Sequence, residues 1–268
     1  MKYNITAVLL ISFNLSAKER IEGEVVALSQ QYGQSCVIAA STDYRPLTTD
    51  HRSQADTIKL NDLPLTVIPS AIGREGPIFF LISGDGGWTI FDNTICESLA
   101  KKGIPAVGLD AKQYFWNAKS PEETTAAFVR IIENYTKQWN KKSFVLAGYS
   151  FGADLVPFIA NKLPESLKNH LTGILLLSPD SYGDFEIHLS DMLHLGISKK
   201  KYNIVNEVKK TKTPQVVSIF GQEEDKANIQ SFKDAGSKIL LLPGDHHYNK
   251  NYTGLVELIL KEIMVKPM

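Results

Sequence analysis

Basic residues are not in excess in this chain, and cysteine is scarce. The 268 residues contain 29 Lys and Arg against 29 Asp and Glu, so the formal net charge is zero. No basic tract favours nucleic acid or an anionic membrane surface as a partner. The two cysteines, Cys36 and Cys96, lack metal-ligand spacing, so we predict no metal site. An oxidising compartment would permit a disulfide between them. However, Cys96 falls in a predicted amphipathic helix and Cys36 in a predicted apolar strand, and two separate buried thiols are the default expectation.

Long hydrophobic runs are also lacking, apart from a short one at the N-terminus. Met1-Lys2 gives a positive start, residues 5–15 are mostly apolar, and Ala17 offers a small residue before the charged Lys18. This pattern is typical of a secretory signal peptide and is too short to span a membrane. A buried N-terminal strand is the alternative. We expect residues 1–17 to be cleaved and the mature protein to be periplasmic.

The rest of the chain has the pattern of an α/β domain. It alternates continuous apolar runs with amphipathic stretches, as expected for a parallel sheet covered on both faces. Strands are predicted at 78–82, 104–109, 144–147, 174–177, 216–220 and 239–242. The clearest helix runs from Pro121 to Asn140, and Ser120 and Glu123 can form a capping box at its start. This alternation predicts a doubly wound, mostly parallel sheet with right-handed crossovers.

Three further segments complete the predicted organisation. Residues 18–75 are more polar, and we interpret them as an extension that adds one or two antiparallel edge strands, the best at Leu65–Ile68. Residues 76–268 form the main domain. Within it, residues 181–212 make a long connection between two strands, which predicts a small cap over the active site.

A G-x-S-x-G pentapeptide, Gly148 to Gly152, lies between a predicted strand and a predicted helix. A strand, a tight turn carrying serine and then a helix form the nucleophile elbow of an α/β-hydrolase. The turn strains the backbone of the serine, and it needs small residues two positions to either side. Ser150 is therefore the candidate nucleophile.

A serine hydroxyl needs a base, and the base needs an orienting acid. In this fold the acid and then the histidine follow the serine, on loops after later strands. The loop after 216–220 offers Asp225, our first choice of acid, with Glu224 as the alternative. The loop after 239–242 offers His246 as the base, with His247 as the alternative. The other four histidines, at 51, 170, 188 and 194, lie outside this frame.

Ester hydrolysis also needs donors for the oxyanion that forms at the attacked carbonyl. The backbone N–H of Phe151, directly after the serine, is one candidate. The loop Ser83-Gly84-Asp85-Gly86-Gly87-Trp88 supplies the second, from Asp85 or Gly86. The glycines there would permit a phosphate loop instead, but G-K-[ST] and G-x-G-x-x-G spacings are absent. We therefore predict no nucleotide cofactor, and no other cofactor.

Several motifs together give a more specific likeness. The Ser83 to Trp88 loop, Tyr114-Phe115-Trp116, the stretch from Gly148 to Asp154 with Pro157-Phe158, Asp184 to His188, and Pro243 to Tyr248 resemble the VirJ/AcvB family of bacterial virulence proteins. The likeness covers roughly residues 60–265. It implies an exported, serine-dependent hydrolase that releases the amino acid from aminoacylated phosphatidylglycerol. It also implies links to virulence and type IV secretion, so secretion-system proteins are candidate partners.

The resemblance gives a role to acids that are otherwise unexplained. Asp154 lies one helical turn beyond Ser150, so it can face the pocket. Carboxylates there would recognise a cationic acyl group through charge-assisted hydrogen bonds, and Trp88 is a further candidate for substrate binding. Asp154 and Asp85 could instead brace the loops by bonding backbone amides. For Asp85 we favour bracing, because an acid beside the developing oxyanion is unfavourable.

Three functions fit the sequence. The first is a periplasmic serine hydrolase of aminoacyl lipid esters, acting on a small-molecule or lipid ester at the membrane surface and not on nucleic acid. The second keeps the triad but acts on generic esters or thioesters. The third is a secretion-associated binding protein on a hydrolase scaffold with an inactive triad.

Overall fold

A computed structural model describes residues 60–73, 76–187, 200–212 and 214–264. These residues belong to one compact unit, Arg52–Met268; the other unit, Met1–His51, lies outside them. The predicted signal peptide, Cys36, three histidines (51, 188 and 194) and most of the 18–75 extension therefore fall outside the description, as do residues 188–199 of the predicted cap.

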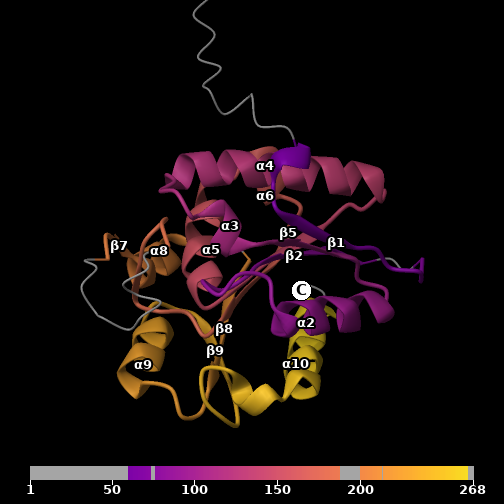
Figure 1. Ribbon diagram of the computed structural model, residues 1–268. Helices are drawn as coiled ribbons and strands as arrows, with labels where there is room; N and C mark the ends of the chain where they lie inside the picture. Colours follow the sequence, from indigo (N-terminus) through magenta and orange to yellow (C-terminus); the bar gives the residue numbers. More distant parts are fainter. Residues whose placement is uncertain (1–59, 74–75, 188–199, 213, 265–268) are drawn as a thin grey trace, which may run out of the picture. The chain divides into compact units, whose positions relative to one another are not determined.

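A seven-stranded sheet forms the centre of the described unit (Figure 1). Its order is β1-β3-β2-β4-β5-β8-β9. The strands are β1 (Leu65–Ile68), β2 (Ile78–Ile82), β3 (Ala106–Leu109), β4 (Phe144–Tyr149), β5 (Leu171–Leu177), β8 (Val216–Gly221) and β9 (Lys238–Leu242). All neighbours pair in parallel except β1, which runs antiparallel to β3. Both the parallel sheet and the antiparallel edge strand at Leu65–Ile68 are confirmed.

Continuous apolar sequence forms the central strands because both of their faces are covered. Every residue of β2, β3, β4 and β8 is buried. The edge strand β9 differs, since its residues Lys238 and Leu241 are exposed.

Helices cover both faces of the sheet (Figure 1). One face packs against α3 (Ala111–Tyr114), α4 (Pro121–Gln138), α5 (Phe151–Lys162), α8 (Ile204–Lys210) and α9 (Lys226–Asp234). The other face packs against α2 (Ile90–Lys101) and α10 (Tyr252–Met264). Short elements complete the unit: α6 (Glu165–Lys168), η2 (Leu60–Asp62) and η3 (Tyr248–Lys250). Cys96 is a buried free thiol in α2, and burial raises its pKa.

The longest helix begins as its sequence predicts. Ser120 is the N-cap of α4, its hydroxyl accepts from the backbone N of Glu123, and the Glu123 carboxylate accepts from the Ser120 backbone. The predicted C-terminal end at residue 140 is two residues late, because Trp139 is the C-cap.

The described part of the predicted cap is a small two-stranded ribbon followed by a helix. Strand β6 (Tyr182–Gly183) pairs antiparallel with β7 (Tyr202–Asn203), and α8 follows at once. Asn203 caps α8 through its side chain, which accepts from the backbone N of Asn206. The ribbon leaves the sheet after β5, so it lies at the carboxyl edge, where the candidate catalytic loops also begin.

Candidate active site

Ser150 occupies a strained turn between β4 and α5. Its φ of 51° and ψ of −121° lie outside the regions that a non-glycine residue normally adopts. The flanking glycines permit this turn. A Cβ at Gly148 would lie 2.2 Å from the carbonyl oxygen of Gly152, and one at Gly152 would lie 2.2 Å from that of Ile82. The predicted strand–serine–helix turn with small neighbours is therefore present.

His246 lies between Ser150 and an acid. Its Nε2 is 2.9 Å from Ser150 Oγ, and its Nδ1 is 3.1 Å from Glu224 Oε2. An ionised carboxylate only accepts hydrogen bonds, so Nδ1 carries the proton and Nε2 is left to accept from the serine. This is the order of contacts in which a serine is activated by a histidine and the histidine is oriented by an acid.

The structure corrects our first choice of acid. Among the described residues Asp225 makes no hydrogen bond to His246; it is the N-cap of α9, and its side chain accepts from the backbone N of Ala227 at 2.8 Å. The alternative, Glu224, reaches the histidine instead. A short acidic side chain directly before a helix satisfies the first backbone N–H groups of that helix, and this local bond draws Asp225 away from the site.

Glu224 is held by two further donors. Its Oε1 accepts from the Ser178 hydroxyl at 2.7 Å and from the backbone N of Gly221 at 2.6 Å. Ser178 is buried, has a φ of 49°, and also contacts the hydroxyl of the fully buried Tyr248 at 2.8 Å. The sequence reasoning missed Ser178, although a polar residue directly after a parallel strand is the signal that could have revealed it.

The other histidine of the loop has a different partner. His247 Nδ1 lies 2.6 Å from the hydroxyl of Tyr149, whose pKa is raised mainly by burial. The described contacts do not join His247 to Ser150. His170 lies at the opposite end of the sheet, directly before β5.

Two opposing effects act on the His246 ring. Burial, the largest single effect, disfavours its charged form, but the hydrogen bond and the negative charge of Glu224 together with the charges of two other acids outweigh burial, so the pKa of His246 lies above its ordinary value. The charges of Asp180 and Asp85 act in the same direction. The histidine is thus suited to accept and hold a proton, as a general base must.

The glycine-rich loop after β2 forms a tight turn beside Ser150. The backbone N of Gly87 donates to the Gly84 carbonyl at 3.0 Å, which leaves Asp85 and Gly86 at the two central positions. Phe151 is the first residue of α5, where backbone N–H groups have no partner within the helix. Buried Ser83 fixes the base of the loop, because its hydroxyl accepts from the backbone N of Ala111 at 2.9 Å.

Two side chains of this loop depart from expectation. Trp88 is not part of the described pocket lining; its indole lies over Gly108 of β3, where a Cβ would come within 1.8 Å of it. Trp88 follows the turn and packs on the sheet, so its predicted role in substrate binding is not supported. Asp85 lines the pocket and makes no bracing hydrogen bond to the described residues.

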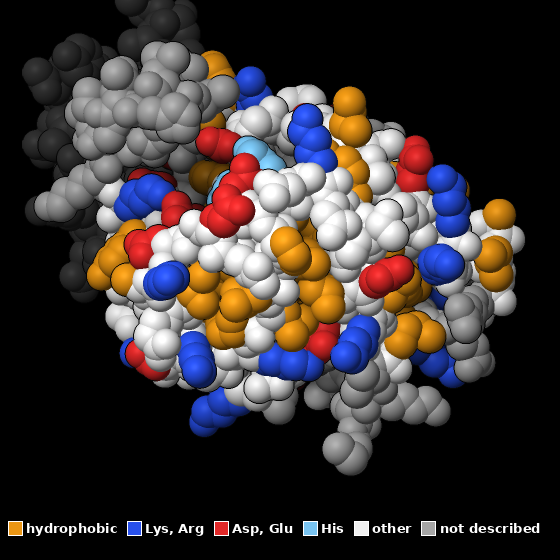
Figure 2. All heavy atoms as spheres, turned by 90° about the horizontal axis from the view of Figure 1, so that it is seen from below, with side chains coloured by type: hydrophobic (Ala, Val, Ile, Leu, Met, Phe, Trp, Pro, Cys, Tyr) orange, Lys and Arg blue, Asp and Glu red, His pale blue; other side chains and the backbone are white. Residues whose placement is uncertain are grey.

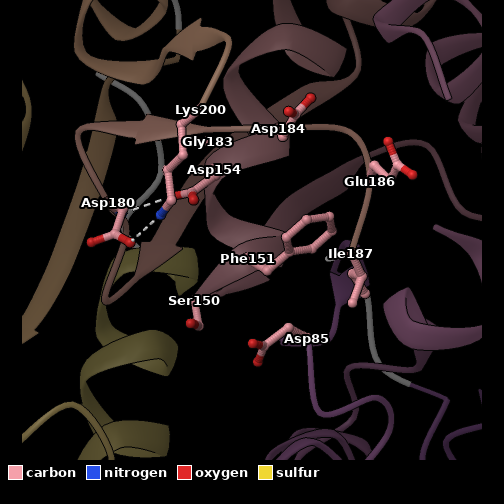
Figure 3. Close-up of a pocket in the computed structure, with 10 residues that line it drawn as sticks. All are labelled: Asp85, Ser150, Phe151, Asp154, Asp180, Gly183, Asp184, Glu186, Ile187 and Lys200. Carbon is pink, nitrogen blue, oxygen red and sulfur yellow. Dashed lines mark hydrogen bonds and ion pairs between the residues drawn. The ribbon is translucent and has the colours of Figure 1, made fainter. Parts of the chain in front are cut away.

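The pocket beside Ser150 is acidic (Figure 3). Its described lining holds one cation, Lys200, against five acids, which are Asp85, Asp154, Asp180, Asp184 and Glu186. Strand β6 and the residues directly after it supply Gly183, Asp184 and Glu186. Viewed from outside, acidic side chains border the histidines on the face shown in Figure 2.

Asp154 is the most buried acid of this pocket, with 3% of its surface exposed. Its Oδ1 accepts from the backbone N of Asp180 at 2.8 Å, which is the predicted bracing role. It also lines the pocket, which is the predicted binding position. Burial, then the charge of Asp180, raises its pKa well above the ordinary value, while the bond from the Asp180 backbone and the charge of Lys200 oppose the rise.

The described part of the chain shows neither a metal-binding cluster nor a membrane-spanning helix. There, no three His, Cys, Asp or Glu side chains gather in a way that could hold a metal ion. None of the described helices combines the length and apolar character needed to cross a bilayer.

The sequence of the chain matches one known protein family. The model of the family described as "Bacterial virulence protein (VirJ)" matches residues 77–266, which is more than half of the chain. The chain belongs to the VirJ family. No curated protein matches this VirJ-family chain.

Solved structures with the same architecture are α/β-hydrolases. Est1E from Butyrivibrio proteoclasticus is 15% identical with a TM-score of 0.53, covering 77% of this chain and 97% of its own. A lipase-esterase related protein from Clostridium acetobutylicum is 16% identical with a TM-score of 0.56, covering 75% and 99%. A monoglyceride lipase from Saccharomyces cerevisiae is 13% identical with a TM-score of 0.52, covering 75% and 92%. At these identities the likeness establishes the fold of the VirJ-family chain, an α/β-hydrolase.

Proposed function

We propose that this VirJ-family protein is a serine hydrolase that cleaves carboxylic esters whose acyl group carries a positive charge. The observation that carries the proposal is a chain of contacts, Glu224 to His246 to Ser150, which ends at a pocket lined by five acids. The three contacting residues supply nucleophilic catalysis, and the acids of the pocket supply recognition of a cation.

The proposed reaction has two halves. Ser150 Oγ attacks the ester carbonyl while its proton passes to His246 Nε2, and the backbone N–H groups of Phe151 and the Asp85–Gly86 turn stabilise the oxyanion. His246 then gives the proton to the departing alcohol. Water, deprotonated by the same histidine, attacks the acyl-enzyme, and His246 returns that proton to Ser150 Oγ as the acid leaves. Glu224 remains ionised throughout and holds the imidazolium.

The acids of the pocket favour an ammonium group on the acyl side. Asp154 follows Ser150 by one helical turn, so its carboxylate lies beside the position of the attacked carbonyl. Only its Oδ1 has a donor among the described residues, which leaves Oδ2 for a ligand. A bound cation favours the ionised carboxylate and so offsets the raised pKa of Asp154.

Aminoacyl esters of phosphatidylglycerol are the substrates that we propose within this class. An aminoacyl group carries an ammonium next to its ester, as the pocket requires, and the family resemblance points to the same lipid. We also propose that the mature protein works in the periplasm, where the N-terminal pattern would direct it. Fractionation of cells that produce the full chain, with N-terminal sequencing of the product, tests that location.

Lipid hydrolysis tests the catalytic part of the proposal. Vesicles containing lysyl- or alanyl-phosphatidylglycerol should lose the aminoacyl lipid and release free amino acid when the protein is added. Ser150→Ala should lower the rate by a factor on the order of 10⁶ with an unchanged circular dichroism spectrum. A fluorophosphonate probe should label Ser150. Absence of labelling would favour a binding protein without activity.

Asp154→Asn tests the cationic part. Asparagine keeps an oxygen to accept from the Asp180 backbone, so the bracing bond survives while the negative charge is lost. We expect KM for a cationic ester to rise roughly 10- to 100-fold, the range for a hydrogen bond to a charged group. KM for the neutral ester of equal length should change little. Equal losses on both esters would show that Asp154 only braces the loop.

A further inference from the structure

One cation enters the acidic pocket from the ribbon side. Lys200 precedes β7, and its Nζ lies 3.0 Å from Asp180 Oδ2. The backbone N of the same Asp180 donates to Asp154, so the ammonium lies next to the buried carboxylate. Figure 3 shows the lysine nitrogen pointing toward the space between the two acids. The positive charge of Lys200 opposes the rise that burial causes in the pKa of Asp154.

The contact is weak enough to be exchanged. The Lys200 side chain is 38% exposed and that of Asp180 is 61% exposed. An ion pair open to water gains little Coulomb energy and pays side-chain entropy to keep its geometry. A substrate ammonium that also bonds Asp154 can therefore replace Lys200 at these carboxylates.

We propose that Lys200 is a tethered cation that occupies the cation subsite of the pocket and competes with the substrate's ammonium for Asp154 and Asp180. This inference rests on the cation-binding pocket of the proposed function. It makes Lys200 a residue that sets specificity. Cationic acyl groups must displace the lysine, whereas neutral acyl groups leave it paired and bind independently of it.

Binding measurements on the Ser150→Ala protein test this role without hydrolysis. The probes are alanine ethyl ester and ethyl propanoate, which differ only in the ammonium next to the ester. We expect Lys200→Met to tighten binding of the cationic ester about two- to fivefold, the range of one exposed ion pair, with the neutral ester unchanged. Lys200→Arg keeps a competing charge and should bind both esters as the Ser150→Ala parent does.

The adjacent lysine is a matched control. Lys201 Nζ lies 5.1 Å from the centre of the Tyr202 ring, and Lys201 is not part of the pocket lining. Lys201→Met removes the same formal charge from the same segment and should not alter binding. Unchanged or weaker binding of the cationic ester by Lys200→Met, equal tightening for both esters, or equal tightening by Lys201→Met would each overturn the inference.

Hydrolysis by the protein with Ser150 intact separates this inference from the proposed function. If no ester is cleaved but Lys200→Met still tightens cationic binding selectively, the hydrolase proposal fails and the role of Lys200 stands. If cationic esters are cleaved preferentially and Lys200→Met changes nothing, the hydrolase proposal stands and the role of Lys200 is wrong.

Discussion

The substitution Glu224→Gln separates charge from shape at the candidate active site. Glutamine can still accept from Gly221 and Ser178, but its NH₂ group would then face His246 Nδ1. Two donors cannot pair, so the histidine must move its proton to Nε2 or turn away. In either case Ser150 loses its base. Loss of the correct tautomer costs a factor on the order of 10⁴ in kcat, which corresponds to about 5.4 kcal/mol of transition-state stabilisation.

The same substitution has a consequence for the pH dependence. His246 must be neutral to accept a proton, so activity rises with pH through its pKa. In the native protein Glu224, together with Asp180 and Asp85, holds that pKa above the ordinary value despite burial of the ring, so the acidic limb should have its midpoint above pH ~6.5. Without the Glu224 carboxylate, less opposes the lowering of the His246 pKa by burial. The limb of the residual activity should move to lower pH.

Asp225→Asn is the matched control, one residue further along the same loop. Asparagine is an equally good N-cap, so activity, pH profile and stability should stay close to the native values. The assay is initial-rate hydrolysis of one soluble ester from pH 5 to 9, with thermal unfolding of each variant. If Asp225→Asn loses as much activity as Glu224→Gln, or if Glu224→Gln keeps most of its activity, the assignment of the acid is wrong.

Four further substitutions test the surrounding geometry. His246→Ala should abolish labelling by a fluorophosphonate probe, whereas His247→Ala should keep it, because only the first contacts the nucleophile; the reverse result would reassign the base. Gly152→Ala places a Cβ 2.2 Å from a backbone oxygen, so it should cost about 1–3 kcal/mol or more in denaturant unfolding, and native stability would show that the turn can relax. Ser178→Ala removes one donor from Glu224, which should lower kcat about tenfold, shift the pH profile and leave KM unchanged; a change in stability alone would make the serine structural.

Sequence patterns predicted most of the fold because they report local physics. The run at 78–82 forms β2 with those bounds, since continuous apolar sequence identifies a strand buried on both faces. The capping box at Ser120 gives the start of α4 for the same reason, because its bonds lie within one turn. Helix ends depend on less specific signals, and α4 ends two residues earlier than predicted.

The site could be predicted only in part. Chain order and strand ends indicated the loops that carry the acid and the base. Which of two adjacent acids faces the histidine depends on where α9 begins, and Asp225 is drawn into the cap of that helix. Lys200 and Asp180 come together because β7 returns to pair with β6, and a pairing between distant parts of the chain leaves no local pattern in the sequence.

The position of β9 at the edge of the sheet has a consequence for how activity is lost. Ser150 follows β4 in the middle of the sheet, whereas His246 follows β9, where Leu241 is 48% exposed and only β8 pairs with it among the described strands. Elements with few buried contacts open at lower free energy than the core. Under mild denaturant, amides of β9 should therefore exchange with solvent before those of β4. His246 would then move out of the site while Ser150 is still in place. Enzymatic activity would end before cooperative unfolding begins.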